Sequence, residues 1–262
     1  MATIQVADAM VGYAVEGPED GIPVLLFHGT TMTRSAWDMV RASMPGDTYR
    51  FVLIEFPGSG ESSMPAEPLT VDAIVAQGLA LMTALGHPVF HVGGYSLGAV
   101  IALATAGTAP ERVLSVTSLC GWAVADARMR VTFELWKQLI ATDPVLFMRY
   151  AMADGFTVGA LTVAESVIES LLPLTAREIA PGSSAHLDLD ITLDITPLVA
   201  AVTAPTLIIG AIEDRWVDIS HSRSLHGAIA GSTLAELPAG HLVIQELAVD
   251  VGALLHAHMG AV

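Results

Sequence analysis

The chain has 262 residues, of which 53% are hydrophobic, and its formal net charge at pH 7 is −16. This length and composition are sufficient for one α/β domain with a large core. The negative charge argues against binding to nucleic acid or to an anionic membrane surface, because lysine and arginine neutralise phosphate in both kinds of complex. A small-molecule substrate is the expected partner, and the oligomeric state is left open.

The N-terminal residues 1–8 contain no basic region followed by an apolar core, so we expect no secretory signal and a cytoplasmic location. Residues 73–110 contain no Asp, Glu, Lys or Arg, but glycines and a proline interrupt the apolar run, which argues against a membrane span. The single cysteine, Cys120, cannot form a disulfide within the chain, and no Cys/His spacing typical of a zinc site occurs. We therefore expect no metal site.

Along most of the chain, short apolar runs typical of strands alternate with amphipathic runs typical of helices. The predicted strands are residues 3–6, 11–15, 24–27, 51–54, 89–92, 113–119, 206–209 and 233–237. The predicted helices among them are residues 37–44, 71–85, 97–106, 220–229 and 243–256. After an initial hairpin, this alternation indicates an α/β fold with a mostly parallel eight-stranded sheet covered by helices on both faces. Ligands bind such sheets beyond the carboxyl ends of the strands.

Within this pattern, residues 88–106 predict a strand, a sharp turn and a helix, with Ser96 at the apex of Gly94-Tyr95-Ser96-Leu97-Gly98. Glycines on both sides permit the strained backbone that such a turn imposes on its central residue. The turn would hold the serine hydroxyl over the carboxyl end of the strand, next to the free N–H groups and positive dipole of the helix. Ser96 is therefore a candidate nucleophile.

The alternation stops between residues 121 and 204, where helical patterns dominate and no strand is predicted. A segment of this length inside a compact domain needs structure of its own. We therefore divide the chain into a core, residues 1–120 and 205–262, and a helical cap, residues 121–204, placed over the site. Helices are expected in the cap at residues 129–141, 144–152 and 163–172.

The cap is rich in bulky apolar side chains, and a small cap must present one face to the cleft beneath it. Trp122, Phe133 and Trp136 are the residues expected to bind the substrate, which would then have an apolar acyl or ring portion. Arg128 and Arg130 are candidates to bind a substrate carboxylate, although arginines on a helix more often face solvent.

Two residues that complement a serine nucleophile follow the last two predicted strands. Asp214 comes after residues 206–209, and His241 comes after residues 233–237. A serine hydroxyl is a poor nucleophile until an imidazole takes its proton, and that imidazole needs a carboxylate to set its tautomer. Glu213 is the alternative acid, but a shift of one residue on an extended segment would turn its side chain away.

The order Ser96, Asp214, His241 resembles the catalytic residues of the α/β-hydrolase superfamily, in its branch with a serine nucleophile. Two further motifs carry the resemblance: His28-Gly29-Thr30-Thr31, similar to the oxyanion loop of that family, and the turn at residues 56–62. The resemblance implies that the amides of Thr30 and Leu97 form the oxyanion hole.

The chain departs from the family pattern at three positions, since Glu55, Ala211 and Asp218 stand where the family usually has Asp, Gly and Pro. The first is expected to be structural, and the other two weaken the assignment of the acid slightly. Among the remaining histidines, only His186, at the end of the cap, is considered able to approach a substrate.

The resemblance implies a cofactor-independent serine hydrolase that cleaves an ester or lactone of a small substrate. Thioesterases, C–C bond hydrolases and perhydrolases use the same groups, and the sequence does not separate them. Two alternatives from other classes are a non-hydrolytic tailoring enzyme, such as a cyclase or lyase, and a ligand receptor with slow turnover. Haloalkane dehalogenases and epoxide hydrolases place Asp at the nucleophile position, so Ser96 excludes them.

Overall fold

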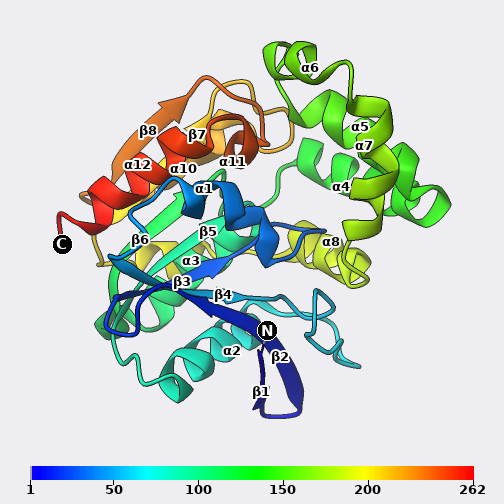
Figure 1. Ribbon diagram of the computed structural model, residues 1–262. Helices are drawn as coiled ribbons and strands as arrows, with labels where there is room; N and C mark the ends of the chain where they lie inside the picture. Colours follow the sequence, from blue (N-terminus) through cyan, green and yellow to red (C-terminus); the bar gives the residue numbers. More distant parts are fainter. Residues whose placement is uncertain (1) are drawn as a thin grey trace.

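The computed structural model describes residues 2–262, whose centre is one eight-stranded sheet (Figure 1). The strands are β1 (Ala2–Val6), β2 (Ala9–Glu16), β3 (Ile22–Phe27), β4 (Tyr49–Ile54), β5 (Phe90–Tyr95), β6 (Val113–Leu119), β7 (Thr206–Ala211) and β8 (Thr233–Leu237). Their order in the sheet is β1-β2-β4-β3-β5-β6-β7-β8. The β1–β2 and β2–β4 pairs are antiparallel and the others are parallel, which confirms the expected fold class.

Helices cover both faces of this sheet. The core helices are α1 (Asp38–Ala42), α2 (Val71–Ala84), α3 (Leu97–Thr108), α10 (Ile219–Ala228), α11 (Val243–Glu246) and α12 (Ala248–Met259). On β3, Leu25 and Phe27 belong to the apolar layer of α2 and α3, whereas Val24 and Leu26 belong to the layer of α1 and α12. Successive side chains of a strand point to opposite faces, so a strand buried on both faces is apolar throughout.

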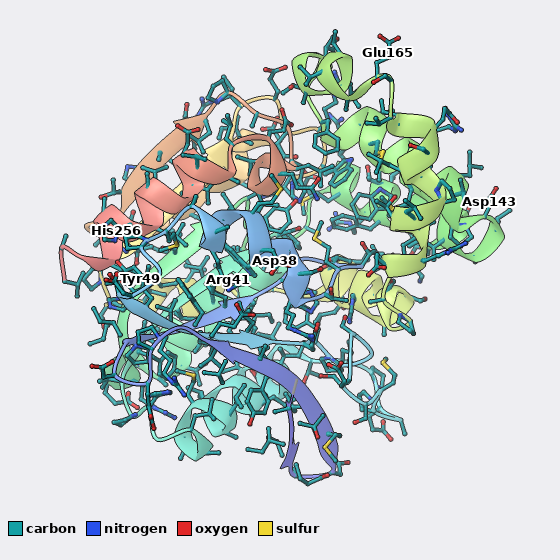
Figure 2. All side chains as sticks on the ribbon, viewed as in Figure 1. Asp38, Arg41, Tyr49, Asp143, Glu165 and His256 are labelled. Atoms are coloured by element: carbon teal, nitrogen blue, oxygen red, sulfur yellow. The ribbon has the colours of Figure 1, made fainter. Side chains whose placement is uncertain are left out.

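The C-terminal helix is anchored to the sheet by a polar contact. The Tyr49 hydroxyl, at the start of β4, lies 2.7 Å from Nδ1 of His256 on α12, and Figure 2 shows the two side chains together.

The prediction of a single helix at residues 243–256 is wrong. The backbone leaves the helical conformation at Leu247 (φ −129°, ψ 42°), which separates α11 from α12.

Between β6 and β7 the chain forms only helices, apart from an isolated bridge between Val124 and Asp194. The helices are α4 (Ala127–Thr142), α5 (Pro144–Gly155), α6 (Val158–Ala164), α7 (Ile168–Thr175), α8 (Ser183–Thr192) and α9 (Thr196–Ala200). In Figure 1, α4 to α8 gather at one edge of the sheet, and Asp143 and Glu165 lie on their outer side in Figure 2. Asp126, Asp143 and Thr157 cap three of these helices through their side-chain oxygens.

The helix expected at residues 163–172 is wrong in its bounds, because α6 ends at Ala164 and α7 begins only at Ile168. Within residues 2–262, no single helix is both long and apolar enough to cross a membrane. A bent pair, Val158–Ala164 with Ile168–Glu178, meets the length and composition test together, at an angle of 99°.

Gly98 allows α3 to contact the end of β3. A Cβ atom at Gly98 would lie 2.3 Å from the carbonyl oxygen of Phe27 and 2.5 Å from that of His28. Both oxygens belong to the backbone, so a side chain would have to displace the helix.

We therefore expect Gly98→Ala to lower the free energy of unfolding by about 1–3 kcal/mol, the usual cost of overpacking a core. Gly227→Ala is the matched control, because Gly227 is also helical but a Cβ there meets nothing within 4 Å. The control should stabilise the protein by about 0.5–1 kcal/mol. Urea unfolding of both variants tests this, and equal midpoints would contradict it.

Candidate active site

Ser96 occupies the turn between β5 and α3 with a strained backbone, φ 57° and ψ −122°. A positive φ is costly for any residue with a side chain and persists only where the surroundings hold it. Here the Ser96 amide donates to the carbonyl of Leu119 on β6 (2.9 Å). Gly94 is required beside it, because a Cβ at that position would lie 1.8 Å from the carbonyl oxygen of Gly98.

The structure brings the three residues expected to form a triad into one hydrogen-bonded chain. Nε2 of His241 lies 3.0 Å from Oγ of Ser96, and Nδ1 lies 2.6 Å from Oδ2 of Asp214. The other carboxylate oxygen of Asp214 accepts from the amides of Trp216 and Val217, both at 2.9 Å. Since the carboxylate can only accept, Nδ1 carries the proton and Nε2 is free to accept one from the serine.

The adjacent acid, Glu213, lies differently. Its side chain is exposed, whereas Asp214 is buried against His241. The geometry therefore favours Asp214 as the partner of the histidine. A further contact holds the histidine loop, because the Tyr95 hydroxyl donates to the backbone carbonyl of His241 (3.0 Å).

The two amides expected to bind an oxyanion belong to residues next to Ser96 in the chain and in the loop after β3. Leu97 is the first residue of α3, so its N–H has no acceptor within the helix. Thr30 lies in the loop after β3 and lines the cavity above Ser96. Neither amide donates to an acceptor within the part of the chain that the structure describes. Both donors are therefore available to a ligand.

A cavity lies over Ser96 and His241. Its walls are mainly aromatic and methionine side chains, from Phe133, Trp136, Phe147, Met148, Met152, Phe156 and Trp216. Phe133 and Trp136 thus line it as expected. Trp122 does not line it: the side chain is fully buried and packs against Phe133, with ring centroids 6.0 Å apart. The expectation that Trp122 faces the cavity is therefore corrected, because its ring is covered by other side chains.

Charged side chains are absent from this lining within residues 2–262 apart from the titratable His241. Arg128 and Arg130 do not line the cavity, and Arg130 donates to the carbonyl of Ala125 instead. His186 also lies elsewhere: it is fully buried, its Nε2 contacts the carbonyl of Pro57 (2.8 Å), and burial lowers its pKa to about 4. These three residues cannot bind a substrate in the cavity as it stands.

Trp216 was not anticipated from the sequence, although it follows the acid by two positions. Its ring packs between those of His241 and Trp136, at centroid distances of 4.9 Å and 4.5 Å. Its indole N–H donates to Asp154 of α5 (3.0 Å). Trp216 therefore connects the helices between β6 and β7 to the histidine.

A second, more open hollow adjoins the cavity. The two share the residues Thr31, Met32, Met148, Thr175 and Gln245. The outer hollow adds polar side chains, from Thr33, Ser35 and Glu178, and apolar ones, from Ala36, Met39 and Ile179. The path to Ser96 is thus mainly apolar throughout, with one carboxylate, Glu178, in its outer part.

Cys120 lies beneath the site, and its sulfur, a carboxylate oxygen of Asp214 and a ring nitrogen of His241 all lie within 4.8 Å of one another. Such donor atoms can bind a transition metal. Here, however, the carboxylate and imidazole are bonded to each other, and burial raises the pKa of the thiol well above its usual range. The arrangement fits a hydrogen-bonded triad better than a metal site.

Known proteins resemble this chain over most of its length. The family model described as "alpha/beta hydrolase fold" matches residues 22–184. A pyrrolizixenacetamide deacetylase from Xenorhabdus hominickii is 29% identical over 92% of this chain and 91% of its own length. A 3-oxoadipate enol-lactonase from Acinetobacter baylyi is 26% identical over 92% of this chain and 89% of its own length.

Solved structures agree with this fold. An enol-lactonase from Burkholderia xenovorans superposes with a TM-score of 0.88 at 19% identity, covering 99% of this chain and 100% of that one. A thermophilic esterase from Thermogutta terrifontis superposes with a TM-score of 0.85 at 20% identity, covering 100% of this chain and 99% of that one.

The burial of Cys120 leads to a simple prediction. We expect its thiol to be unreactive toward dithionitrobenzoate at pH 8 in the folded protein, because the reactive species is the thiolate and burial disfavours it. After unfolding in guanidinium chloride, the same assay should release one equivalent of thionitrobenzoate. Rapid labelling of the folded protein would contradict the buried placement.

Proposed function

Because the chain belongs to the α/β-hydrolase fold family, we propose that it is a cofactor-independent serine hydrolase that cleaves an ester or lactone. The observation that carries the proposal is the hydrogen-bonded chain of Ser96, His241 and Asp214 at the base of an apolar cavity. Family membership alone would not decide the reaction, because one fold hosts many chemistries.

In this mechanism Ser96 Oγ attacks the acyl carbon while Nε2 of His241 takes the hydroxyl proton. Asp214 stabilises the imidazolium that forms, and the amides of Thr30 and Leu97 bind the oxyanion. The imidazolium then protonates the departing alkoxide, which leaves an acyl-serine. Water, deprotonated by His241, attacks the acyl carbon, and the acid leaves as Ser96 recovers its proton.

Trp216 supports this cycle by packing on His241. The two rings are tilted by 48° with their centroids 4.9 Å apart, so the indole restricts the orientation of the imidazole that exchanges the proton. The indole is itself held in place by packing against Trp136 and by its hydrogen bond to Asp154.

The lining supports a neutral substrate with an apolar acyl group. Aromatic and methionine side chains surround the space beside Ser96, and no lysine or arginine of residues 2–262 is present there to pair with an anion. A carboxylate without a partner is costly to remove from water. The outer hollow contains one carboxylate, Glu178, and no lysine or arginine of residues 2–262, which suits an uncharged or cationic alcohol portion.

The relatives support acyl chemistry in general. A deacetylase and an enol-lactonase both break a bond to an acyl carbon. The 3-oxoadipate enol-lactone in the name of the second relative keeps one free carboxylate, whereas the cavity of this chain offers no lysine or arginine among its described residues to pair with one. A neutral ester therefore fits this site better than a carboxylated lactone.

The nucleophile is tested with p-nitrophenyl esters of increasing acyl length. We expect turnover by the native protein, a loss of kcat of about 10⁶-fold in Ser96→Ala, and a loss of about 10⁴-fold in Asp214→Asn. Glu213→Gln is the matched control and should retain full activity, because its side chain is exposed.

Turnover that survives in Ser96→Ala would remove serine catalysis from consideration. A burst of one equivalent without turnover would favour a ligand receptor, and no reaction at any chain length would favour a tailoring enzyme.

Charge selectivity is tested with p-nitrophenyl butyrate and mono-p-nitrophenyl succinate, whose acyl groups have the same length and differ by one carboxylate. We expect kcat/KM to be at least about 100-fold lower for the succinate, which corresponds to about 3 kcal/mol for burying an unpaired carboxylate. Comparable values for the two esters would show that a cation reaches the acyl group, and the neutral-substrate assignment would be withdrawn.

A further inference from the structure

A carboxylate outside the triad, Asp190, lies directly behind the loop that carries Thr30. It belongs to α8, between β6 and β7, and is fully buried. Its Oδ2 accepts a hydrogen bond of 2.7 Å from the Thr30 hydroxyl, across 160 positions of sequence. Its Oδ1 has no hydrogen-bond partner in the described chain. A buried carboxyl with one short contact is unusual, because such groups are normally satisfied at both oxygens.

The loop that this contact reaches is strained. Thr31 has φ 67°, a left-handed conformation that favours glycine. Such a conformation persists where the surrounding structure holds it. On one side Thr31 accepts from the amide of Ala180, just before α8, at 2.9 Å, and on the other side Thr30 is bound by Asp190.

The segment that supplies these contacts is itself anchored to the core. The amide of Gly182 donates to the carbonyl of Gly58 (2.9 Å), and His186 contacts the carbonyl of Pro57. The start of α8 is thus held against the turn after β4, and Asp190 is held against the loop after β3. The Asp190 carboxyl that accepts from the Thr30 hydroxyl is therefore held in place relative to the core.

We propose that Asp190 is a positioning residue that fixes the Thr30 amide of the oxyanion hole from behind, through the Thr30 hydroxyl. The proposal rests on the proposed serine hydrolase function. An oxyanion hole works because its donors are already oriented before charge develops, and small displacements of a donor are costly in rate. The Asp190–Thr30 hydrogen bond supplies this orientation for the one oxyanion donor that lies in a loop rather than in a helix.

The charge state of Asp190 agrees with this role. Burial raises its pKa to about 8, so the carboxyl is largely protonated at neutral pH. A neutral carboxyl accepts from Thr30 without placing a negative charge behind the oxyanion. The one polar group bonded to it is the Thr30 hydroxyl, and burial lowers the pKa of His186, one turn earlier on α8, to about 4. No arginine or lysine of residues 2–262 forms an ion pair with Asp190.

The test measures kcat, KM and thermal stability for four variants. Thr30→Val keeps the shape of the side chain and removes the hydroxyl, Asp190→Ala removes the acceptor, and Asp190→Asn keeps an acceptor without a charge. Asp188→Asn is the control, because Asp188 lies on the same helix but pairs with Lys137 at the surface.

We expect Thr30→Val and Asp190→Ala each to lower kcat by about ten- to a hundredfold, somewhat less than the loss of an oxyanion donor, with KM changed less than about twofold. The double variant should lose no more than the larger single loss, because both changes break one contact. Asp190→Asn should retain kcat within about threefold, and Asp188→Asn should be unchanged.

A pH profile separates this role from simple packing. Between pH 7 and 9 the native Asp190 ionises, so kcat of the native protein should fall relative to that of Asp190→Asn. The native protein should also lose thermal stability relative to Asp190→Asn as pH rises from about 4 to 8, since the folded state binds the extra proton in that interval.

Several results would overturn the proposal. One is an unchanged kcat in Thr30→Val while Ser96→Ala is inactive, which would leave the serine mechanism intact and remove the role of Asp190. Multiplicative losses in the double variant would likewise show two independent effects. If Asp190→Ala does not fold, Thr30→Val and Asp190→Asn still decide the question. Full activity of Ser96→Ala would remove both this proposal and the function on which it rests.

Discussion

The site depends on the close contact between the first turn of α3 and the ends of β3 and β5. Gly94 and Gly98 permit backbone atoms to approach where any side chain would collide. This contact imposes the positive φ of Ser96, raises its hydroxyl above the sheet and leaves the Leu97 amide free. Parallel strands end at the same edge, so the loops after β7 and β8 deliver Asp214 and His241 to that hydroxyl without further adjustment.

The helices between β6 and β7 contact both halves of the site. Asp154 of α5 holds Trp216, which packs on His241, and Asp190 of α8 holds Thr30. A segment that only covered the cavity would affect the choice of substrate and leave the reactive groups alone. Here the same helices shape the apolar space and contact residues next to the base and the oxyanion donor, so substrate choice and rate are physically connected.

The net charge of the chain and the composition of the cavity walls both favour a neutral ligand. The chain has a net charge of −16, which repels anions approaching from solution. Close to Ser96, the walls are aromatic and methionine side chains, and the buried carboxylate of Asp214 is compensated by two amides and His241. A neutral molecule with an apolar portion meets neither the repulsion outside nor the desolvation cost inside.

Most features that could be predicted from the sequence come from patterns among residues close together in the chain. The order of strands and core helices, the turn at Ser96 and the pairing of an acid with a histidine all depend on residues that are neighbours in the chain or on the rule that parallel strands end together. The break at Leu247, the split between α6 and α7, the burial of Trp122 against Phe133, and the contacts of Trp216 and Asp190 were decided only by the tertiary structure. The Trp216–Asp154 and Thr30–Asp190 hydrogen bonds join residues 62 and 160 positions apart, and the periodicity of residues along the chain does not reveal which distant side chains will meet.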